Sequence, residues 1–480
     1  MVYIAKIFKK INIYLLIVLV LSAISCGIIY QNILINRGPS KWDESTHFMF
    51  GVRIYQDIVR GKFLFFLDDT LRQDLWPFIY SWELSLFFLL TGRISITSAR
   101  ILSLLLFFLC SLVLYGLGKE VAKDNDRLAG AITSGLLLIS PLPVLFSAWA
   151  MLEMPGLLAS SLALLTYIKA RENNKRLYLL TGFLVAGTFL TKYNYGFHLI
   201  VMLVIMFLVD TRFKFRRILL EDNPYPYLFL PLVGILLLSN FKSQIHGFLL
   251  LLKHSTYYQL ATSTWRGFTY YPISLFKDYN SSVFVFAIII ISFILSFKEW
   301  KTRGVKILLI FFISGFLSLM LLSNKQNRFL ITIMPAIWVL TARQIAKMLS
   351  EVSRRAIKPY IKWGLAILFL DLIVPGVLNL YREQPASSDE DIYEALDFIS
   401  EQIDPAQFTL ILGESDDMSP DLINWWVVKK TGLFHRDLKL IRPYQPPSSS
   451  SYERELNKIL SAIEIPTIVA IEMKSPQEVW

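Results

Sequence analysis

Residues 98–118 and 128–147 read SARILSLLLFFLCSLVLYGLG and LAGAITSGLLLISPLPVLFS, and the charged segment KEVAKDNDR (119–127) separates them. Each apolar stretch is about 20 residues long, which is the length that a helix needs to cross the hydrocarbon core of a bilayer. The charges between the two stretches are typical of a short loop at the membrane surface. This pair therefore predicts two membrane-spanning helices and an all-α polytopic membrane protein.

The same pattern recurs along most of the chain, which has 480 residues, 54% of them hydrophobic and 18% charged, and a mean hydropathy of +0.50. Further apolar stretches fall at 11–30, 154–169, 226–242, 281–297, 305–323, 328–346 and 361–380. Residues 177–209 hold two shorter ones, separated by TKYNYG, which fit either two full spans or two half-helices. The stretches together predict about 11 transmembrane helices, the first of which we expect to be retained rather than cleaved as a signal.

Lys and Arg residues give the chain a net charge of +11 and gather in short loops. The clusters are Lys6/Lys9/Lys10, Lys119/Lys123/Arg127, Lys169/Arg171/Lys175/Arg176, Arg212/Lys214/Arg216/Arg217, Lys298/Lys301/Arg303/Lys306 and Arg343 through Lys362. All fall on one side if the amino terminus is cytoplasmic and the spans alternate, as in a multi-pass protein of the cell membrane. The Lys and Arg clusters therefore indicate which side of the membrane each loop lies on, and nucleic acid is not an expected partner.

The stretch WPFIYSWELSLFFLL (76–90) breaks the alternation if it is counted as a span. It is short, contains Pro77 and Glu83, and would move every later basic cluster to the outside. We therefore expect a juxtamembrane helix in the interface, and residues 31–97 become one large first external loop with juxtamembrane helices.

The chain changes character near residue 382. REQPASSDEDIYEALDFISEQI (382–403) has the pattern of a linker and an amphipathic helix, and FTLILG (408–413) and TIVAIEM (467–473) have the pattern of short buried strands. The prediction is a membrane domain over residues 1–381 and a small soluble α/β domain over 382–480. Because the span count is odd, this domain is expected outside the membrane, on the extracytoplasmic side.

Acidic residues near apolar segments are the first candidates for chemistry. Asp43 and Glu44 are adjacent in KWDESTHF (41–48), and Glu153 is the only charge in FSAWAMLEMPGLLASSLALLTY (146–167). Acids also suit the first turn of a helix, which explains each of them without any function. The predicted topology puts all three on the outer face, however, where converging acids suit a general base and an acceptor-binding partner.

Three cations are expected on the same outer face. Lys192 lies in FLTKYNYG, and Lys325 and Arg328 lie in SNKQNRFLITIMPAIWVL. Each alone is explained by a long side chain that reaches the membrane surface. Together they fit an anionic lipid phosphate, to which arginine offers a planar fork of donors.

The predicted external loop at 243–280 is rich in aromatic residues around HSTYYQLATSTWRGFTYYP. His254, Tyr257, Trp265 and Arg266 are candidates for binding a sugar or an acceptor by stacking and hydrogen bonds. An aromatic belt at the membrane–water boundary explains the same residues.

These segments resemble the GT-C superfamily of membrane glycosyltransferases over roughly residues 10–350, and the closest branch is that of the protein O-mannosyltransferases and the lipid A aminoarabinose transferase. The resemblance rests on WDES after the first helix, AMLEMP, FLTK and NKQNRFLITIMPA, in this order and on a common side. Two departures stand out. DLWPF (74–78) replaces a His-Pro-Pro-like turn, and Phe329 replaces the usual Tyr after the arginine.

The resemblance implies a GT-C-like fold and a sugar donor that is a monosaccharide linked to polyprenyl phosphate. It implies transfer to a hydroxyl on the outer face with inversion, Asp43 as general base, and Glu44 and Glu153 as residues that orient the acceptor or the base. Lys192, Lys325 and Arg328 would neutralise the departing phosphate. No cofactor is firmly implied, although paired carboxylates could hold a divalent metal ion. The acceptor is a protein, a lipid or a glycan, which the sequence does not distinguish.

Three other functions fit parts of the pattern. A transporter or flippase of lipid-linked sugars also needs many spans, but transporters tend to show inverted repeats and charges near the midplane. No internal repeat is evident here. A polymerase or ligase of surface polysaccharide would share the lipid substrate without needing the acidic pair, and a membrane scaffold would use the tail to bind partners.

Overall fold

The computed structural model describes residues 12–354, apart from short gaps, residues 212–222 and most of 240–263. In the carboxyl-terminal part it describes residues 390–403, 408–412, 420–431, 439–441 and 467–470. The chain forms two compact units. The first comprises Met1–Leu34, Thr70–Tyr80 and Arg100–Glu383, and the second comprises Ile35–Asp69, Ser81–Ala99 and Gln384–Trp480.

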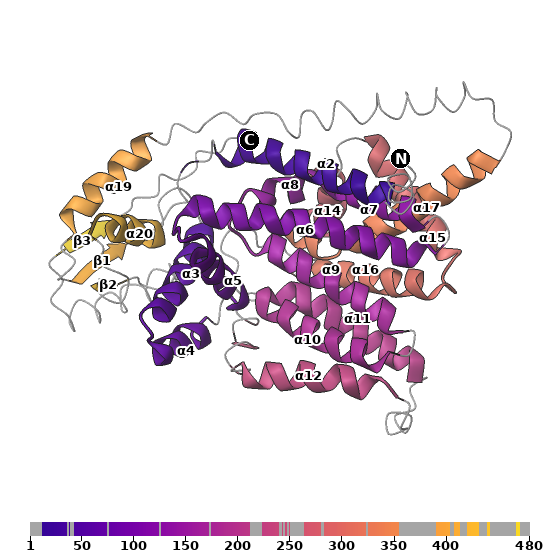
Figure 1. Cartoon of the computed structure of the whole chain (residues 1–480), viewed down its shortest axis with the longest axis horizontal. Coiled ribbons are helices and arrows are strands. Elements are labelled where there is room, and N and C mark those ends of the chain that lie inside the picture. Colours follow the sequence, from indigo (N-terminus) through magenta and orange to yellow (C-terminus); the bar gives the residue numbers. More distant parts are fainter. Residues whose placement is uncertain are drawn as a thin grey trace, which may run out of the picture. The chain divides into compact units, whose positions relative to one another are not determined.

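The described part of the first unit is built from helices (Figure 1). They are α2 (Ile13–Ile29) with its π-helical extension η1 (Tyr30–Leu34), α6 (Ile96–Ala122), α7 (Asp126–Leu138), α8 (Pro141–Ser147), α9 (Glu153–Ala170), α10 (Lys175–Thr191), α11 (Tyr193–Thr211), α12 (Tyr225–Leu238), α14 (Trp265–Lys277), α15 (Val283–Phe297), α16 (Arg303–Leu321), the 3-10 helix η3 (Asn327–Thr332) and α17 (Met334–Arg354). Helix α10 packs against α9, α11 and α12.

Several of these helices are suited to crossing a membrane. Among the described residues, four helical segments are long and apolar enough, namely Ile13–Leu34, α6, α11 and α16. The pair α7 and α8 would make a fifth if it is one bent span, and α5 (Ile79–Thr91), α12 and α15 are shorter apolar helices. The membrane part of the chain is thus all-helical, with several apolar spans. The count of about 11 stays a prediction, and the expected span at 361–380 lies outside the described residues.

One predicted span differs in detail from the structure. The stretch 128–147 is bent by 70° between α7 and α8, where Ser140 caps α8 and Pro141 opens it. Proline has no N–H to continue the hydrogen bonds of a helix, which explains the break at this point. Residues 177–209 form two separate helices, α10 and α11, which meet at Lys192 in an extended conformation.

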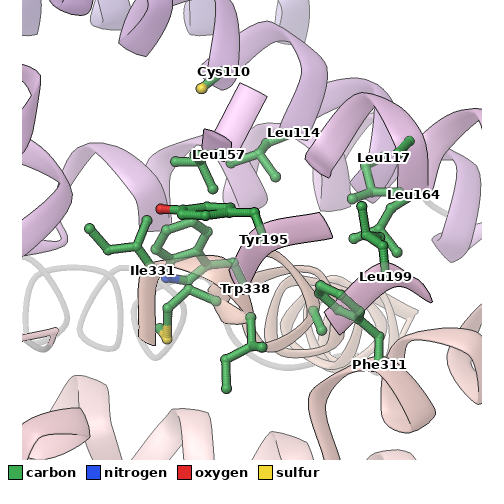
Figure 2. Packing of buried hydrophobic residues seen from close by; sticks show 14 of the residues in the cluster. Cys110, Leu114, Leu117, Leu157, Leu164, Tyr195, Leu199, Phe311, Ile331 and Trp338 are labelled. Atoms are coloured by element: carbon green, nitrogen blue, oxygen red, sulfur yellow. The ribbon is translucent and has the colours of Figure 1, made fainter. Parts of the chain in front are cut away.

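Small residues allow the helices of this unit to approach one another closely. A Cβ atom on Gly182 of α10 would lie 2.2 Å from the carbonyl oxygen of Leu228 in α12. A Cβ atom on Gly196 of α11 would lie 2.3 Å from the Cα atom of Phe189 in α10. Close packing of this kind replaces the hydrophobic effect as the force that joins helices in lipid. Figure 2 shows the apolar interior, where side chains of α6, α9, α11, α16 and α17 form one continuous core.

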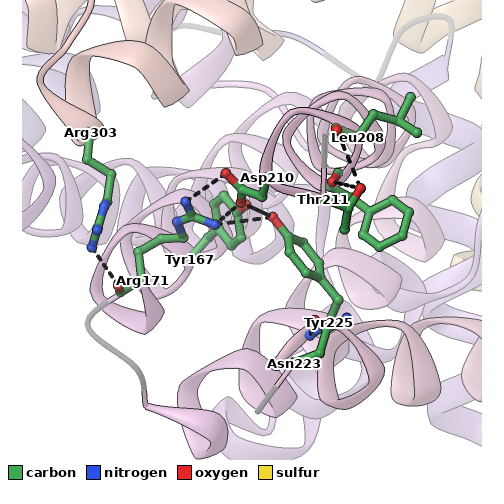
Figure 3. Close-up of polar contacts among 9 residues, drawn as sticks. Tyr167, Arg171, Leu208, Asp210, Thr211, Asn223, Tyr225 and Arg303 are labelled. Atoms are coloured by element: carbon green, nitrogen blue, oxygen red, sulfur yellow. Dashed lines mark hydrogen bonds and ion pairs between the residues drawn. The ribbon is translucent and has the colours of Figure 1, made fainter. Parts of the chain in front are cut away.

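A polar network ties the ends of α9, α11 and α12 together (Figure 3). The Arg171 guanidinium forms a two-pronged ion pair with Asp210, and its Nη2 lies 3.1 Å from Asp210 Oδ1. The Tyr225 hydroxyl donates to the same carboxylate at 2.5 Å, and Arg303 of α16 donates to the Arg171 carbonyl at 2.6 Å. All these groups are neighbours of the basic loops that are predicted to be cytoplasmic.

The second unit combines loop helices with elements of the tail. Its helices are α3 (Asp43–Val59), α4 (Phe63–Leu71), most of α5, α19 (Glu390–Gln402) and α20 (Pro420–Thr431). The strands β1 (Phe408–Leu412), β2 (Lys439–Ile441) and β3 (Thr467–Ala470) form a parallel sheet in the order β2-β1-β3. The expected helix near 382–403 and the two expected strands are present, whereas β2 was not expected. The domain boundary at 382 stays a prediction.

Candidate active site

The acidic pair opens helix α3 of the second unit. Asp43 and Glu44 occupy its first turn, where a negative charge is favourable beside the free N–H groups and the helix dipole. The two side chains differ in exposure. Glu44 is fully buried, whereas Asp43 is only partly buried. Of the pair, Asp43 is therefore the carboxylate with access to solvent.

The third acid, Glu153, opens helix α9 of the first unit and is completely buried. Its Oε1 atom is ion-paired with Lys192 Nζ and lies 3.7 Å from Arg328 Nη1. Lys192 and Arg328 are each only 5% exposed. A buried carboxylate is tolerated when cations compensate it, and here two cations surround one acid. The cluster of Glu153, Lys192 and Arg328, named here the charged cluster, carries a net charge of +1.

Lys192 is held by the way in which α10 and α11 meet. It caps the C-terminus of α10 in an extended conformation, and α11 begins at the next residue. The Tyr195 hydroxyl, on the first turn of α11, donates to the Glu153 carbonyl oxygen at 3.2 Å. The Lys192 ammonium also lies 5.8 Å from the centroids of the Tyr195 and Phe329 rings. Helices α9, α10 and α11 therefore fix the ion pair from both ends.

Arg328 is held by the 3-10 helix η3. Its Nε atom donates to Gln326 Oε1 at 2.6 Å, and the Tyr279 hydroxyl donates to the Asn327 carbonyl at 2.8 Å. Behind it, His198 of α11 is hydrogen-bonded to Thr332 of the same turn at 3.0 Å. These contacts hold η3 in place and so fix the position of the Arg328 guanidinium.

Lys325 has different surroundings, at the C-terminal end of α16. Its Nζ donates to the carbonyl oxygens of Leu319 at 3.1 Å and Met320 at 2.7 Å, and it lies 5.1 Å from the centroid of the Tyr271 ring in α14. A cation is favourable at a helix C-terminus, where the last carbonyls have no helical partner. Burial lowers the pKa of Lys325 to about 8, so its charge is sensitive to mild alkali.

The expected sugar-binding residues are only partly described. Trp265 and Arg266 open α14 and are exposed, Trp265 by 78%. His254 and Tyr257 lie outside the described residues. Among the described residues, no three His, Cys, Asp or Glu side chains gather into a group that could hold a metal ion.

Sequence reasoning missed four residues that support these charges: Tyr195, Tyr271, Tyr279 and Gln326. The only signal for Gln326 is its place between Lys325 and Arg328, where an amide can bind the neighbouring guanidinium. The three tyrosines have no such signal, because an aromatic residue near a span carries no information about its hydrogen-bond partner.

Comparison with known proteins relates part of the chain to one family. Residues 76–241, which include Glu153 and Lys192, match the family of dolichyl-phosphate-mannose-protein mannosyltransferases. No curated protein matches the chain.

Solved structures of two enzymes share the fold. The chain is similar to ArnT from Cupriavidus metallidurans bound to undecaprenyl phosphate, with a TM-score of 0.58 and 14% identity over 95% of this chain and 89% of the other. It is also similar to the oligosaccharyltransferase AglB from Archaeoglobus fulgidus, in complex with an inhibitory peptide and a dolichol-phosphate. That match has a TM-score of 0.57 and 13% identity over 94% of this chain and 69% of the other.

The matches to solved structures support the fold over most of the chain, and the family model supports the family resemblance over residues 76–241, about a third of the chain. The protein is a membrane protein that resembles the protein O-mannosyltransferase and ArnT branch of the GT-C glycosyltransferases, whose donors are sugars linked to polyprenyl phosphate.

Proposed function

We propose that this protein transfers a monosaccharide from a polyprenyl-phosphate donor to a hydroxyl group of an acceptor on the outer face of the membrane, with inversion at the anomeric carbon. The observation that carries the proposal is the charged cluster, in which the nearly buried Lys192 and Arg328 both lie beside the buried Glu153 carboxylate. Fixed, water-shielded cations of this kind suit a lipid-linked phosphate, which reaches a membrane protein laterally through the bilayer.

The reaction consists of one displacement. The acceptor oxygen forms a bond to the anomeric carbon while the bond from this carbon to the phosphate oxygen breaks, and the bonding electrons stay with the phosphate. Asp43 takes the proton of the hydroxyl as the new bond forms, which a carboxylate can do because the hydroxyl becomes acidic only in the transition state. Attack opposite to the leaving phosphate inverts the configuration.

The basic residues act on the leaving group. A polyprenyl-phosphate sugar is a phosphodiester with one negative charge, and the polyprenyl phosphate that leaves can carry a second. Lys192, Lys325 and Arg328 stabilise the charge that develops on it, and prearranged charges in a dry site contribute strongly to such a step. Glu153 fixes two of these cations in place, and Glu44 supports the turn that carries Asp43.

The exposed aromatic start of α14 supplies candidates for sugar or acceptor contacts, namely Trp265 and Arg266, with His254 and Tyr257 on the preceding segment. The partners that the proposal implies are membrane lipids, the lipid-linked donor, and an acceptor that is a protein, a lipid or a glycan.

The test compares a deletion strain with strains complemented by the full-length chain or by Asp43→Asn. Mass spectrometry of surface glycans and glycolipids should show a glycoconjugate that is lost on deletion and is not restored by Asp43→Asn at normal protein abundance. Asp126→Asn, the same change at a partly exposed carboxylate of α7, should restore it. Restoration by Asp43→Asn at the normal rate would show that Asp43 is not the base.

A further inference from the structure

Helix α3, which begins with the acidic pair, packs within the second unit against helix α20 of the carboxyl-terminal part. The Thr46 hydroxyl donates to Asp421 Oδ2 at 2.8 Å, although the two residues are 375 positions apart in the chain. The Phe48 ring meets the Trp425 ring edge to face, with centroids 4.8 Å apart and an angle of 88° between the planes.

Both contacts lie one turn beyond an acid. Residues three or four apart are neighbours on one side of a helix. Thr46 is three residues after Asp43, and Phe48 is four residues after Glu44. The hydrogen bond of Thr46 therefore lies on the same side of α3 as Asp43, and the ring contact of Phe48 lies on the same side as Glu44.

The rest of α3 is fixed by helix α5 of the same external loop. Phe48 and Tyr55 contact the Phe88 ring, with centroid distances of 5.8 and 6.3 Å. At Gly51 the helices are so close that a Cβ atom would lie 2.6 Å from the Leu84 Cβ. These contacts lie at or beyond Phe48, so α5 secures the middle of α3 and α20 secures its first turn.

Helix α20 is itself anchored to α19. Leu396 and Ile403 form an apolar core with Leu422, Ile423, Val427 and Val428. On the adjoining side, Trp426 Nε1 donates to Asp397 Oδ1 at 2.9 Å, and Lys430 Nζ lies 2.9 Å from the same atom. Trp425 and Trp426 both pack against this core, but the Trp425 ring also contacts Phe48 of α3, whereas the Trp426 indole N–H bonds to Asp397 of α19.

We propose that Asp421 and Trp425 are positioning residues for the acidic pair: through Thr46 and Phe48 they hold the first turn of α3 so that the Asp43 carboxylate is aimed at the acceptor hydroxyl. The inference rests on the proposed function, in which Asp43 is the base. In this proposal the carboxyl-terminal part influences the rate of the chemical step through the position of Asp43. A shift of a base by about 1 Å can reduce a rate by up to about 100-fold.

The experiment uses the full-length chain with Asp421→Ala or Trp425→Ala, each beside a conservative variant. Asp421→Asn keeps an oxygen that accepts from Thr46, and Trp425→Phe keeps an aromatic edge. The first readout is the rate at which the glycoconjugate reappears in the deletion strain after induction. The second is the affinity of the purified protein for undecaprenyl phosphate, used as a probe of the lipid-phosphate site.

The alanine variants should lower the rate about tenfold and leave the affinity for undecaprenyl phosphate unchanged, and the conservative variants should restore most of the rate. Thr46→Val, which tests the contact from the α3 side, should cause the same loss as Asp421→Ala. Combining the two should add little, because both remove one interaction. Trp426→Phe is the matched control, since it removes the indole N–H that bonds to Asp397 and keeps an aromatic ring, and it should keep the normal rate.

The outcomes separate the two hypotheses. A normal rate in both alanine variants, together with an inactive Asp43→Asn protein, overturns the positioning role and leaves the proposed function intact. A normal rate in Asp43→Asn overturns the proposed function itself. A loss of protein abundance and of undecaprenyl phosphate affinity that the conservative variants do not relieve also overturns the positioning role, because it shows a general folding defect.

Discussion

At the scale of single residues, the charged cluster links stability to function. Glu153 is wholly buried, and its carboxylate is compensated by Lys192 from the α10–α11 junction and Arg328 from η3. Removing one partner of a buried pair leaves an uncompensated charge, whereas removing both charges is much better tolerated. The same cations are the proposed partners of the donor phosphate. Their contribution to stability and their contribution to phosphate binding can be separated by substitution.

Lys192→Met should lower the free energy of unfolding by about 3 kcal/mol, because it removes a cation that is ion-paired with the buried Glu153 carboxylate. The double variant Lys192→Met with Glu153→Gln should recover most of this stability but should not recover affinity for undecaprenyl phosphate. Thermal unfolding and lipid binding of the purified proteins check both parts. A single variant as stable as the parent would contradict the compensating role of Lys192.

Lys325 predicts a pH dependence. Its pKa is lowered to about 8, so in the free protein its charge is retained below this value and lost as the pH rises through it. A bound phosphate favours the charged form. Affinity for undecaprenyl phosphate should therefore be highest near pH 7, where the phosphate has lost its second proton and Lys325 is still charged. It should fall as the pH rises past 8, with less fall for Lys325→Arg, whose guanidinium stays charged. An identical alkaline fall in both proteins would remove Lys325 from the phosphate site.

The sequence predicted the charged residues of the cluster but not their pairing. Glu153, Lys192 and Arg328 were singled out because charges are costly beside apolar segments. Their partners depend on the angle at which α9, α10 and α11 meet and on the turn of η3, and no periodicity in the sequence records these angles. For the same reason the sequence does not predict the contacts of Lys325 with the end of α16 and the Tyr271 ring.

At the scale of elements, the junction of α10 and α11 is what places Lys192. The two helices leave Lys192 between them, and the backbone of Phe189 lies against Gly196. The composition of this stretch predicted two apolar segments around TKYNYG. It did not distinguish two full helices from two half-helices, because segment length alone was short of the usual span.

Gly196→Ala should damage this junction. The added Cβ atom would lie 2.3 Å from the Phe189 Cα atom, and backbone on both sides leaves little room for relief. We expect a loss of at least about 1–3 kcal/mol in stability, the usual cost of overpacking, and a matching loss of lipid-phosphate binding as Lys192 shifts. Thermal unfolding in detergent measures the first effect.

The matched control for this change is Gly234→Ala in α12, where a Cβ atom meets nothing within 4 Å. It should be neutral or slightly stabilising, because alanine has the higher helix propensity. Equal stability of the two variants would contradict the close approach at Gly196.

The bend between α7 and α8 and the strand β2 show two other limits of sequence reasoning at this scale. Pro141 and Pro143 were visible in the stretch 128–147, but a proline can kink a span or end it, and hydrophobicity does not distinguish the two. Strand β2 spans only Lys439–Ile441, and its pairing with β1 depends on residues far away in the chain. A run of three residues has too little pattern to predict a strand.

At the scale of the whole molecule, the predicted topology puts the amino terminus in the cytoplasm and the loops with the candidate residues outside. The chain has two cysteines, Cys26 and Cys110, so Cys26→Ser with Cys110→Ser gives a background for labelling. In that background, a membrane-impermeant thiol reagent added to intact cells should label Arg266→Cys. It should label Lys301→Cys only after the membrane is opened, and labelling of Lys301→Cys in intact cells would contradict the predicted sidedness.

The level of the donor itself shows whether a lipid-phosphate sugar is the donor and whether Asp43 acts on its transfer. Polyprenyl-phosphate sugars are extracted from the deletion strain carrying either the parent chain or Asp43→Asn and are quantified by liquid chromatography and mass spectrometry. We expect one such lipid to accumulate with Asp43→Asn while its sugar disappears from the surface glycoconjugate. Unchanged levels of every polyprenyl-phosphate sugar, with the glycoconjugate intact, would show that the proposed donor and the proposed role of Asp43 are wrong.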